Sequence, residues 1–287
     1  MGSCVLGVTR CANREFRWGE RTYIMGVINV TPDSFSGDGL GHDIKAAVAQ
    51  GKRFAAEGAD IIDIGGESTR PRSEPVSVDE ELRRVIPVIE RLASEVPLPL
   101  SIDTYNWEVA RQALSSGARM INDIWGLRHD HRLAELAVEW RVPIVLMSNQ
   151  RDTSTQNIMP EIISSLRKSM ALAMERGVAQ ENIIVDPGVG FGKTLEQNLE
   201  IVYRLDEIKC LGRPILIGTS RKSMIGLVLS LPPAQRLEGT AATIAISIAK
   251  GADMVRVHDV AQMARVCQMS DAIIRGKCQP KEQNQGR

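Results

Sequence analysis

Short segments rich in β-branched residues alternate regularly with longer amphipathic segments along this chain. Eight short segments have the composition of strands: Tyr23–Ile28, Asp60–Ile64, Leu98–Ile102, Arg119–Asn122, Pro143–Met147, Asn182–Val185, Pro214–Ile217 and Asp253–Val257. Segments with apolar residues three and four positions apart predict helices: Ile44–Glu57, Asp79–Ser94, Trp107–Ser115, Glu161–Arg176 and Thr240–Lys250. Strands joined through helices must run parallel, because a parallel pair needs a long crossover connection.

Three of the predicted helices end in the same way before the next strand. Gly58, Gly117 and Gly251 are each followed by alanine, and a glycine suits the left-handed residue that closes a helix. We interpret this as a repeated βα unit without chemistry of its own. Eight such units with no linker rich in Gly, Ser or Pro predict an α/β fold with a single closed (β/α)8 barrel, a TIM barrel. An open doubly wound sheet is the alternative.

The domain organisation follows from where this alternation begins and ends. Residues 1–20 read as a short β-hairpin with arms Cys4–Val8 and Glu15–Trp18, which we expect to close the barrel floor. Residues 21–276 would form the barrel, and residues 277–287 a polar tail that we expect to be disordered.

Charge and cysteine content exclude several classes of protein. The 35 basic and 35 acidic residues give a net charge of zero, which argues against a general nucleic-acid binder. No apolar run approaches the length of a membrane span, and the N-terminus has no secretory signal pattern. The five cysteines include no C-x-x-C pair, which favours reduced thiols. We expect a cytoplasmic globular protein.

Polar residues follow the predicted strands at their carboxyl ends, where parallel barrels place their active sites. Asp103, Asn122 and Asp186 end the third, fourth and sixth strands, and Lys222 follows the seventh. Two carboxylates and an amide offer partners to a flat heterocycle with several N–H donors and ring acceptors. A lysine supplies a cation for a ring carbonyl. The sequence therefore predicts one mouth that binds such a heterocycle.

The last strand and the first contribute residues for a different ligand. Arg256 and His258 lie two positions apart, so both face the barrel axis, and arginine binds phosphate oxygens through a rigid fork. Asn29 could contact Mg²⁺ through oxygen. Heterocycle, diphosphate and metal together describe one substrate. The structural alternative is that Arg256 pairs with a carboxylate such as Asp63 and only stabilises the barrel.

Seven motifs occur in order along the chain: Met25–Ser36, Asp63–Pro71, Ser101–Thr104, Asn122-Asp123, Asp186–Lys193, Ser220–Ser223 and Arg256–Asp259. With these motifs the chain resembles the dihydropteroate synthases of folate biosynthesis, from Tyr23 to Ile274. The resemblance implies a pterin-binding barrel and a transferase of alkyl or aryl groups. Such an enzyme joins 6-hydroxymethyl-7,8-dihydropterin diphosphate to 4-aminobenzoate in an SN1-like reaction that releases diphosphate. It also implies Mg²⁺, a homodimer and the target class of the sulfonamides.

The resemblance assigns roles to individual residues of this sequence. The pterin would be held by Asp103, Asn122, Asp186 and Lys222, with Met147 against its face and Gly218 nearby. The diphosphate would be held by Asn29, Arg256 and His258, with Asn29 also close to Mg²⁺. The aminobenzoate would be framed by Thr69, Arg70, Phe191, Lys222 and Ser223. Catalysis would depend on Asp103, Lys222, Arg256 and His258.

One stretch departs from the family pattern. Where relatives read Leu-Met-His-Met or similar, this chain keeps Met147 but continues with Ser148 and Asn149. This leaves the details of the pterin mouth, and a specialised paralogue, open. The glycine-rich segment after Asp186 matches neither a P-loop nor a dinucleotide fingerprint, because Pro187 and Lys193 occupy positions that those motifs reserve for glycine.

Three rival interpretations are weaker. A pterin-dependent methyltransferase would share the Asp/Asn grip without needing a diphosphate clamp, and a non-catalytic pterin-binding subunit would lose the clamp or the loops. His129 and His131 are better explained as the exposed start of a helix than as a metal pair, because no third ligand is apparent.

Overall fold

The main sheet is a closed parallel barrel in the computed structural model, which describes residues 6–30, 44–67, 76–153 and 155–276. Its strands are β3 (Tyr23–Asn29), β4 (Ile61–Gly65), β5 (Leu100–Asp103), β6 (Met120–Asp123), β7 (Ile144–Met147), β8 (Ile183–Asp186), β9 (Leu216–Ile217) and β10 (Met254–Val257). They pair in the order β8-β7-β6-β5-β4-β3-β10-β9. A parallel bridge between Val185 and Ile215 joins the two edges, which confirms the barrel over the open sheet.

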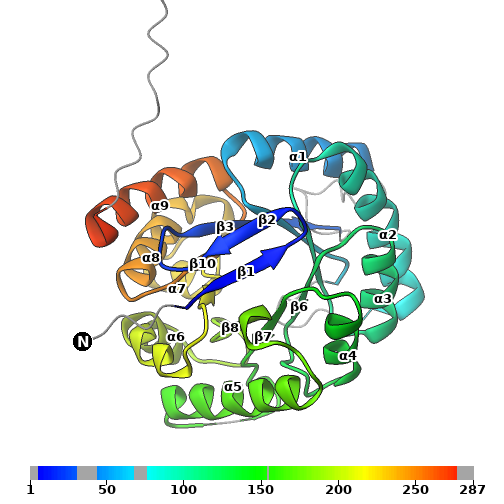
Figure 1. Cartoon of the computed structure of the whole chain (residues 1–287). Coiled ribbons are helices and arrows are strands. Elements are labelled where there is room, and N and C mark those ends of the chain that lie inside the picture. The colour runs from blue at the N-terminus through cyan, green and yellow to red at the C-terminus, as the bar shows by residue number, and fades with distance from the viewer. Residues whose placement is uncertain (1–5, 31–43, 68–75, 154, 277–287) are drawn as a thin grey trace, which may run out of the picture.

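Helices surround this barrel (Figure 1). They are α1 (Ile44–Glu57), α2 (Val78–Glu95), α3 (Trp107–Ser115), α4 (Arg132–Glu139), α5 (Ile158–Glu175), α6 (Leu195–Tyr203), α7 (Ser223–Leu229), α8 (Leu237–Ala249) and α9 (Val260–Arg275). Short 3-10 helices are η2 (Gln180–Asn182), η3 (Leu205–Leu211) and η4 (Pro233–Gln235). In the part of the chain that the structure describes, no helix combines the length and apolarity that a membrane crossing requires.

Local sequence explains where several helices begin and end. The Ser77 hydroxyl accepts the N–H of Glu80 at 3.3 Å and so caps α2, whose first turn is acidic. At the other end of the βα units, Gly58, Gly117 and Gly251 have φ of +99°, +122° and +102°. The left-handed closing glycines expected from the sequence are therefore confirmed.

Side chains on the strands alternate between two separate cores. The outward cluster packs the sheet against the helices and includes Ile62, Ile64 and Ile102. The inward cluster fills the barrel and includes Met25, Ile61, Met120, Val145, Ile184, Leu216 and Met254. Successive strand residues point to opposite faces, so the inward positions nearer the carboxyl ends lie above this apolar layer. On β4, β6, β8 and β10 those positions carry Asp63, Asn122, Asp186 and Arg256.

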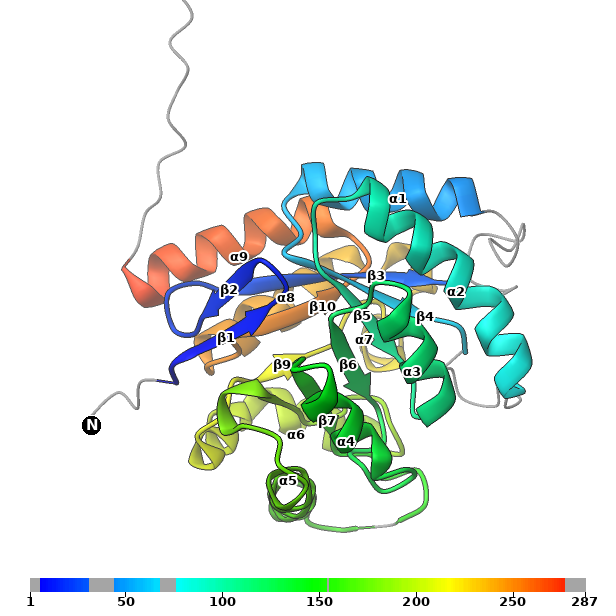
Figure 2. The same cartoon turned by 45° about the vertical axis from the view of Figure 1, so that its right-hand side comes forward.

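The N-terminal hairpin is present, but its first arm differs from the prediction. It consists of β1 (Val8–Cys11) and β2 (Arg14–Arg17), paired antiparallel so that Cys11 lies opposite Arg14. Of the expected arm Cys4–Val8, residues 4 and 5 lie outside the described residues and residues 6 and 7 precede the strand, so the predicted bounds were wrong. The turn falls at Ala12 and Asn13, where Ala12 has a positive φ of 53°. This register buries Cys11 and Phe16 against the inward cluster. The hairpin thus covers one end of the barrel (Figures 1 and 2).

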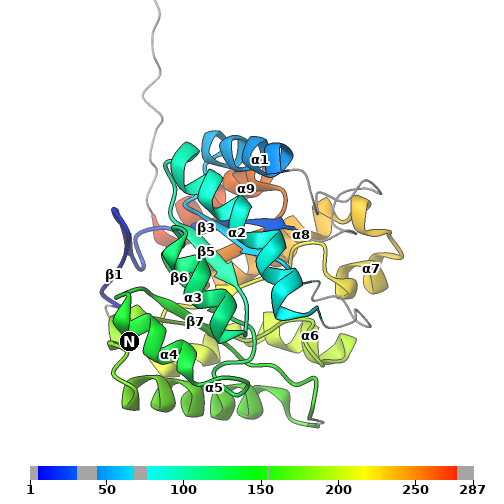
Figure 3. The ribbon, with the colours of Figure 1, turned by 90° about the vertical axis from the view of Figure 1, so that its right-hand side faces the viewer.

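Figure 3 shows the molecule from the side, with β1 on the left and α7, which follows β9, on the right. The hairpin and the carboxyl ends of the strands therefore lie at opposite ends of the barrel. The predicted tail, residues 277–287, lies outside the described residues.

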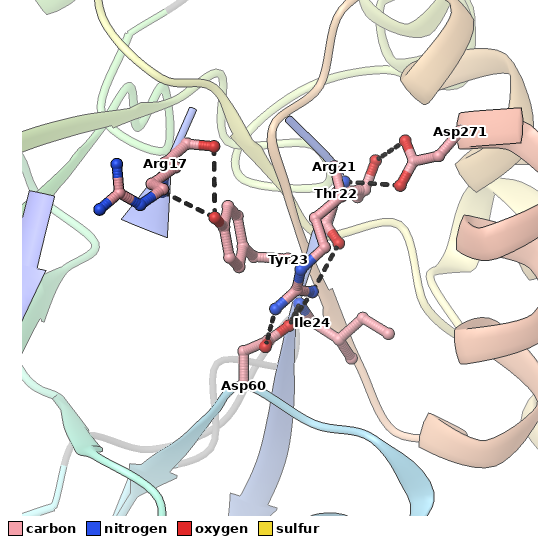
Figure 4. Close-up of polar contacts among 7 residues, drawn as sticks. All are labelled: Arg17, Arg21, Thr22, Tyr23, Ile24, Asp60 and Asp271. Carbon is pink, nitrogen blue, oxygen red and sulfur yellow. Dashed lines mark hydrogen bonds and ion pairs between the residues drawn. The ribbon is translucent and has the colours of Figure 1, made fainter. Parts of the chain in front are cut away.

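Two buried carboxylates attach the start of β3 to its neighbours (Figure 4). Asp60 accepts from Arg21 Nη1 and from the Ile24 N–H, both at 2.9 Å. Asp271, on α9, accepts the Thr22 N–H at 2.7 Å and the Thr22 hydroxyl at 2.8 Å. Because Asp271 is only 6% exposed, these bonds replace most of its hydration and link α9 to the barrel floor.

We expect Asp271→Asn to lower the free energy of unfolding by about 1–3 kcal/mol, because one oxygen becomes an NH₂ group facing a donor in a buried site. Urea denaturation would measure the loss. Asp152→Asn is the matched control, since Asp152 is 53% exposed in its pair with Arg128 and should change stability by less than about 1 kcal/mol. Equal losses in both variants would contradict this role of Asp271.

Candidate functional site

Polar side chains of five strands meet at the carboxyl end of the barrel. Asp63, Asp103, Asn122 and Asp186 are buried, with exposed fractions of 7% or less, and Arg256 is 17% exposed. The structure therefore brings together residues that are far apart in the sequence. Of these five, Asp63 was considered from the sequence only as a structural partner of Arg256.

Arg256 joins two of these carboxylates. Its Nε donates to Asp63 Oδ2 and its Nη2 to Asp103 Oδ2, each at 2.6 Å. Burial alone would lower the pKa of Arg256, but the charges of Asp63 and Asp103 outweigh it and raise that pKa. The Asp63 pairing is the one that the structural alternative required. The anion-binding role of Arg256 stays a prediction, and it now has to be tested separately from this ion pair.

Asp63 also orients the amide of Asn122. Asn122 Nδ2 donates to Asp63 Oδ2 at 3.1 Å, so the nitrogen is used within the protein. The amide oxygen makes no hydrogen bond with any described residue. Asn122 can therefore present an acceptor to a ligand with N–H groups, with the orientation assigned from this hydrogen bond.

Burial changes the acidity of the groups at the mouth. It raises the pKa of Asp186 to about 6, although the carboxylate accepts the Gly188 N–H at 2.7 Å and lies near cations. Burial also raises the pKa of Asp103, against the opposing charge of Arg256. Burial and the charge of Arg256 lower the pKa of Lys222 to about 8. The site holds two carboxyl groups and a lysine that titrate closer to neutral pH than usual, as functional sites often do.

His258 is a neutral donor rather than a second cation. Burial and the positive charges of Arg256 and Arg221 lower its pKa to about 3. Its Nδ1 lies 3.0 Å from the Ser220 hydroxyl, which accepts the backbone N–H of His258 at 3.2 Å. That hydroxyl can donate its proton to Nδ1, which favours the tautomer with hydrogen on Nε2. Without a ligand, His258 is therefore uncharged beside these cations, and its Nε2–H is available as a donor.

The loops after β7 and β8 pack backbone against backbone. A Cβ on Gly188 would lie 2.1 Å from the Ser148 carbonyl oxygen, and one on Gly192 2.2 Å from the carbonyl carbon of Gln150. Between the loops, Lys193 Nζ donates to the carbonyls of Ser148 (2.9 Å) and Gly188 (2.8 Å), among others. The glycine-rich segment serves this close approach. Nothing in the sequence marked Lys193 as a link between two loops.

The departure at Ser148 and Asn149 is accommodated inside the β7 loop. The buried Ser148 hydroxyl accepts from Gln150 Nε2 at 2.8 Å. Asn149 Nδ2 donates to the Ile124 carbonyl at 3.0 Å. Met147 remains buried in a small cluster with Ile124 and Phe191. Ser148 and Asn149 thus fix the conformation of the loop after β7 through these hydrogen bonds, and Met147 lines the mouth.

Two cations lie against the ring of Phe191 at the edge of the mouth. Lys222 Nζ is 4.4 Å and Arg151 Cζ 4.7 Å from the centroid of its ring. Lys222 Nζ makes no hydrogen bond or ion pair with the described residues. The expected neighbours Phe191 and Lys222 are therefore in contact, whereas Ser223 is exposed at the first residue of α7. Thr69 and Arg70 lie outside the described residues.

Asn29 and Gly218 are also at this end of the barrel. A Cβ on Gly65 would lie 3.8 Å from Asn29 Oδ1 and 3.6 Å from Asp103 Oδ2, so both oxygens border the same point. A Cβ on Gly218 would lie 3.7 Å from that of Arg256. One amide oxygen, completed by water and phosphate oxygens, is a set that Mg²⁺ accepts. Residues 6–30, 44–67, 76–153 and 155–276 contain no group of three His, Cys, Asp or Glu suited to a metal.

His129 and Asp123 make contacts that stabilise the fold near the mouth. The His129 ring packs on Tyr105 with centroids 4.6 Å apart. Asp123 is buried and accepts the N–H groups of Trp125 at 2.8 Å and Leu127 at 2.6 Å. The matching Asn122-Asp123 motif thus combines one residue at the mouth with one that shapes the following turn.

Comparisons with known proteins agree with this geometry. The family model described as pterin binding enzyme matches residues 25–258. Dihydropteroate synthase of Clostridium beijerinckii is 52% identical over 267 residues, covering 93% of this chain and 99% of the relative. A Clostridium difficile dihydropteroate synthase structure, determined in the presence of pteroic acid, is 51% identical with a TM-score of 0.87, covering 91% and 99% of the two chains.

A second solved structure is that of Xanthomonas albilineans dihydropteroate synthase with 4-aminobenzoic acid. It is 42% identical, has a TM-score of 0.88, and the match covers 93% of this chain and 97% of that one. The sequence motifs, the barrel and these comparisons lead to one conclusion. The chain belongs to the family of pterin-binding enzymes and, within it, to the dihydropteroate synthases.

Proposed function

We propose that the barrel mouth joins 6-hydroxymethyl-7,8-dihydropterin diphosphate to 4-aminobenzoate and releases diphosphate, as a step of folate biosynthesis. The observation that supports this most is the buried set of Asp103, Asn122 and Asp186 beside the cations Lys222 and Arg256. A heterocycle rich in N–H groups needs these acceptors, and a diphosphate needs these cations.

The pterin would enter above the apolar layer of the barrel. Asp186 would accept paired hydrogen bonds from the amino and ring N–H groups, and Asn122 would offer the oxygen that Asp63 leaves available. Lys222 would donate to the ring carbonyl. Because these groups are buried and already oriented, little reorganisation is needed when the ligand binds.

The diphosphate would lie toward β10 and β3. Arg256 would share the charge that develops on its oxygens, and His258 would donate from Nε2. Asn29 Oδ1 would hold Mg²⁺ at the same edge. When bound, this ion would neutralise negative charge on the leaving diphosphate.

The reaction follows from these contacts. The bond from the CH₂ group to the diphosphate oxygen breaks first, and its electron pair leaves with the diphosphate. The electron-rich dihydropterin delocalises the resulting positive charge, and Asp103 stabilises it. The aniline nitrogen then forms the new C–N bond and loses a proton. No enzyme nucleophile is needed.

Diphosphate release, measured with and without 4-aminobenzoate, tests this proposal. We expect release and dihydropteroate formation to depend on the aromatic amine. A chain that binds pterin tightly but releases no diphosphate under any condition would instead be a binding subunit.

We expect Phe191→Ala to raise KM for 4-aminobenzoate more than KM for the pterin diphosphate. The ring is only 7% exposed and contacts Lys222 and Arg151, and the resemblance to the family places it beside the second substrate. Thr69→Ala should act in the same direction. Steady-state kinetics with each substrate varied in turn would measure both constants, and equal rises would contradict this division of the mouth.

We also propose a homodimer formed through the side of the barrel that includes α6, α7 and α8. Large apolar side chains are exposed there, most of all Tyr203, Leu227 and Val228, at 71%, 64% and 54%. These helices contact one another and lie on one side of the barrel in Figure 1, so their exposed residues form one surface. Sedimentation velocity would show whether the chain is a dimer. A cytoplasmic location, suited to free thiols such as Cys210, is part of this proposal.

A further inference from the structure

We infer that Arg151 is a specificity-determining residue that recognises the carboxylate of the aromatic amine substrate. Arg151 follows β7 in the stretch where the chain departs from the family pattern, and no motif assigned it a role. The inference rests on the proposed function, because it identifies which end of the second substrate this residue contacts.

The two cations beside Phe191 differ in depth. Lys222 is the inner one, because it is only partly exposed and its charge interacts with Asp186, which does not act on Arg151. Arg151 is exposed at the rim, with Cζ 4.7 Å from the ring centroid. The amine and carboxylate of 4-aminobenzoate lie at opposite ends of its ring. Since the amine must reach the CH₂ group of the pterin, the carboxylate points outward, toward the rim cation.

The position of Arg151 is tied to that of Phe191. Its backbone N–H donates to Asn149 Oδ1 at 3.1 Å, and the preceding Gln150 N–H donates to the Phe191 carbonyl at 3.3 Å. Gly192 allows the two loops to touch. A side chain on this loop is therefore held at a defined place beside the aromatic subsite, as recognition of a short rigid substrate requires.

The charges at this edge favour an anion. Arg151 and Lys222 repel each other, and this repulsion contributes to the lowered pKa of Lys222. A carboxylate near Phe191 would relieve that repulsion and could accept hydrogen bonds from the planar guanidinium fork. The negative charges of Glu67 and Asp103 raise the pKa of Arg151, so its guanidinium lies close enough to the mouth to interact with charges there.

The experiment compares two amines, 4-aminobenzoate and the neutral 4-aminobenzamide. We expect Arg151→Gln to lower kcat/KM for the acid by roughly ten- to a hundredfold while changing that for the amide by less than about threefold. Arg151→Lys should recover part of the preference for the acid. The loss of discrimination is the diagnostic quantity, because a packing defect would affect both amines equally.

Arg132→Gln is the matched control. Arg132 also lies over an aromatic ring, with Cζ 5.0 Å from the Trp107 centroid, but it starts α4 on the outside of the barrel. It should leave the ratio of the two kcat/KM values unchanged. Equal losses for acid and amide in Arg151→Gln would overturn the inference while leaving the proposed function intact. Failure of the unaltered chain to convert either amine would overturn the proposed function itself.

Discussion

Replacement of Arg256 by alanine is expected to cost about 2–4 kcal/mol of transition-state stabilisation, because it removes a preorganised charge donor for the departing diphosphate. The affinity for a pterin without phosphate should change much less. Single-turnover rates and calorimetry with the free pterin would measure the two effects. Stability should fall as well, because Asp63 is fully buried and would lose its cation.

A second variant separates the two roles of Arg256. Arg256→Ala leaves two buried carboxylates, Asp63 and Asp103, without their cation; adding Asp63→Asn removes one of these charges and should restore part of the melting temperature. Turnover should remain low in the double variant if Arg256 binds the diphosphate. Recovery of turnover together with stability would show that the arginine acts only through its ion pair with Asp63 at 2.6 Å.

Asp186→Asn is expected to weaken pterin binding severely in a chain that still folds. Asparagine can still accept the Gly188 N–H, which contacts only Oδ1 at 2.7 Å. An NH₂ group replaces the other oxygen and faces the N–H donors of the pterin. Each such mispaired buried group costs about 1–3 kcal/mol. Calorimetry would measure the affinity, and an unchanged value in the folded variant would contradict the assignment.

The pH dependence of pterin binding provides a second measurement on the same carboxylate. Burial raises the pKa of Asp186 to about 6. The ionised form accepts the pterin, so protons compete with the ligand: affinity is fully present above this pKa and decreases as the pH falls through it. The asparagine variant should lack this part of the pH profile. A profile with the same inflection in both forms would assign it to another group.

Much of the barrel could be predicted because its determinants are local. The strands and the closing glycines Gly58, Gly117 and Gly251 follow from short-range periodicity and backbone sterics. The hairpin register could not be predicted in the same way. It depends on burial of Cys11 and Phe16 in a barrel formed by residues far along the chain.

The candidate site divides along the same physical boundary. The chemical groups at the carboxyl ends of the strands can be read from the sequence, since the order of strands and loops is covalent. Which of these groups contact one another depends on how the barrel closes. Asp63 accepts hydrogen bonds from Arg256 and from the Asn122 amide, and the Arg151 guanidinium packs against the Phe191 ring. His258 is uncharged when no ligand is bound. Those contacts form only when the barrel closes. The pKa of His258 depends on its burial and on nearby charges, and both effects are set by distances between residues that no local sequence pattern encodes.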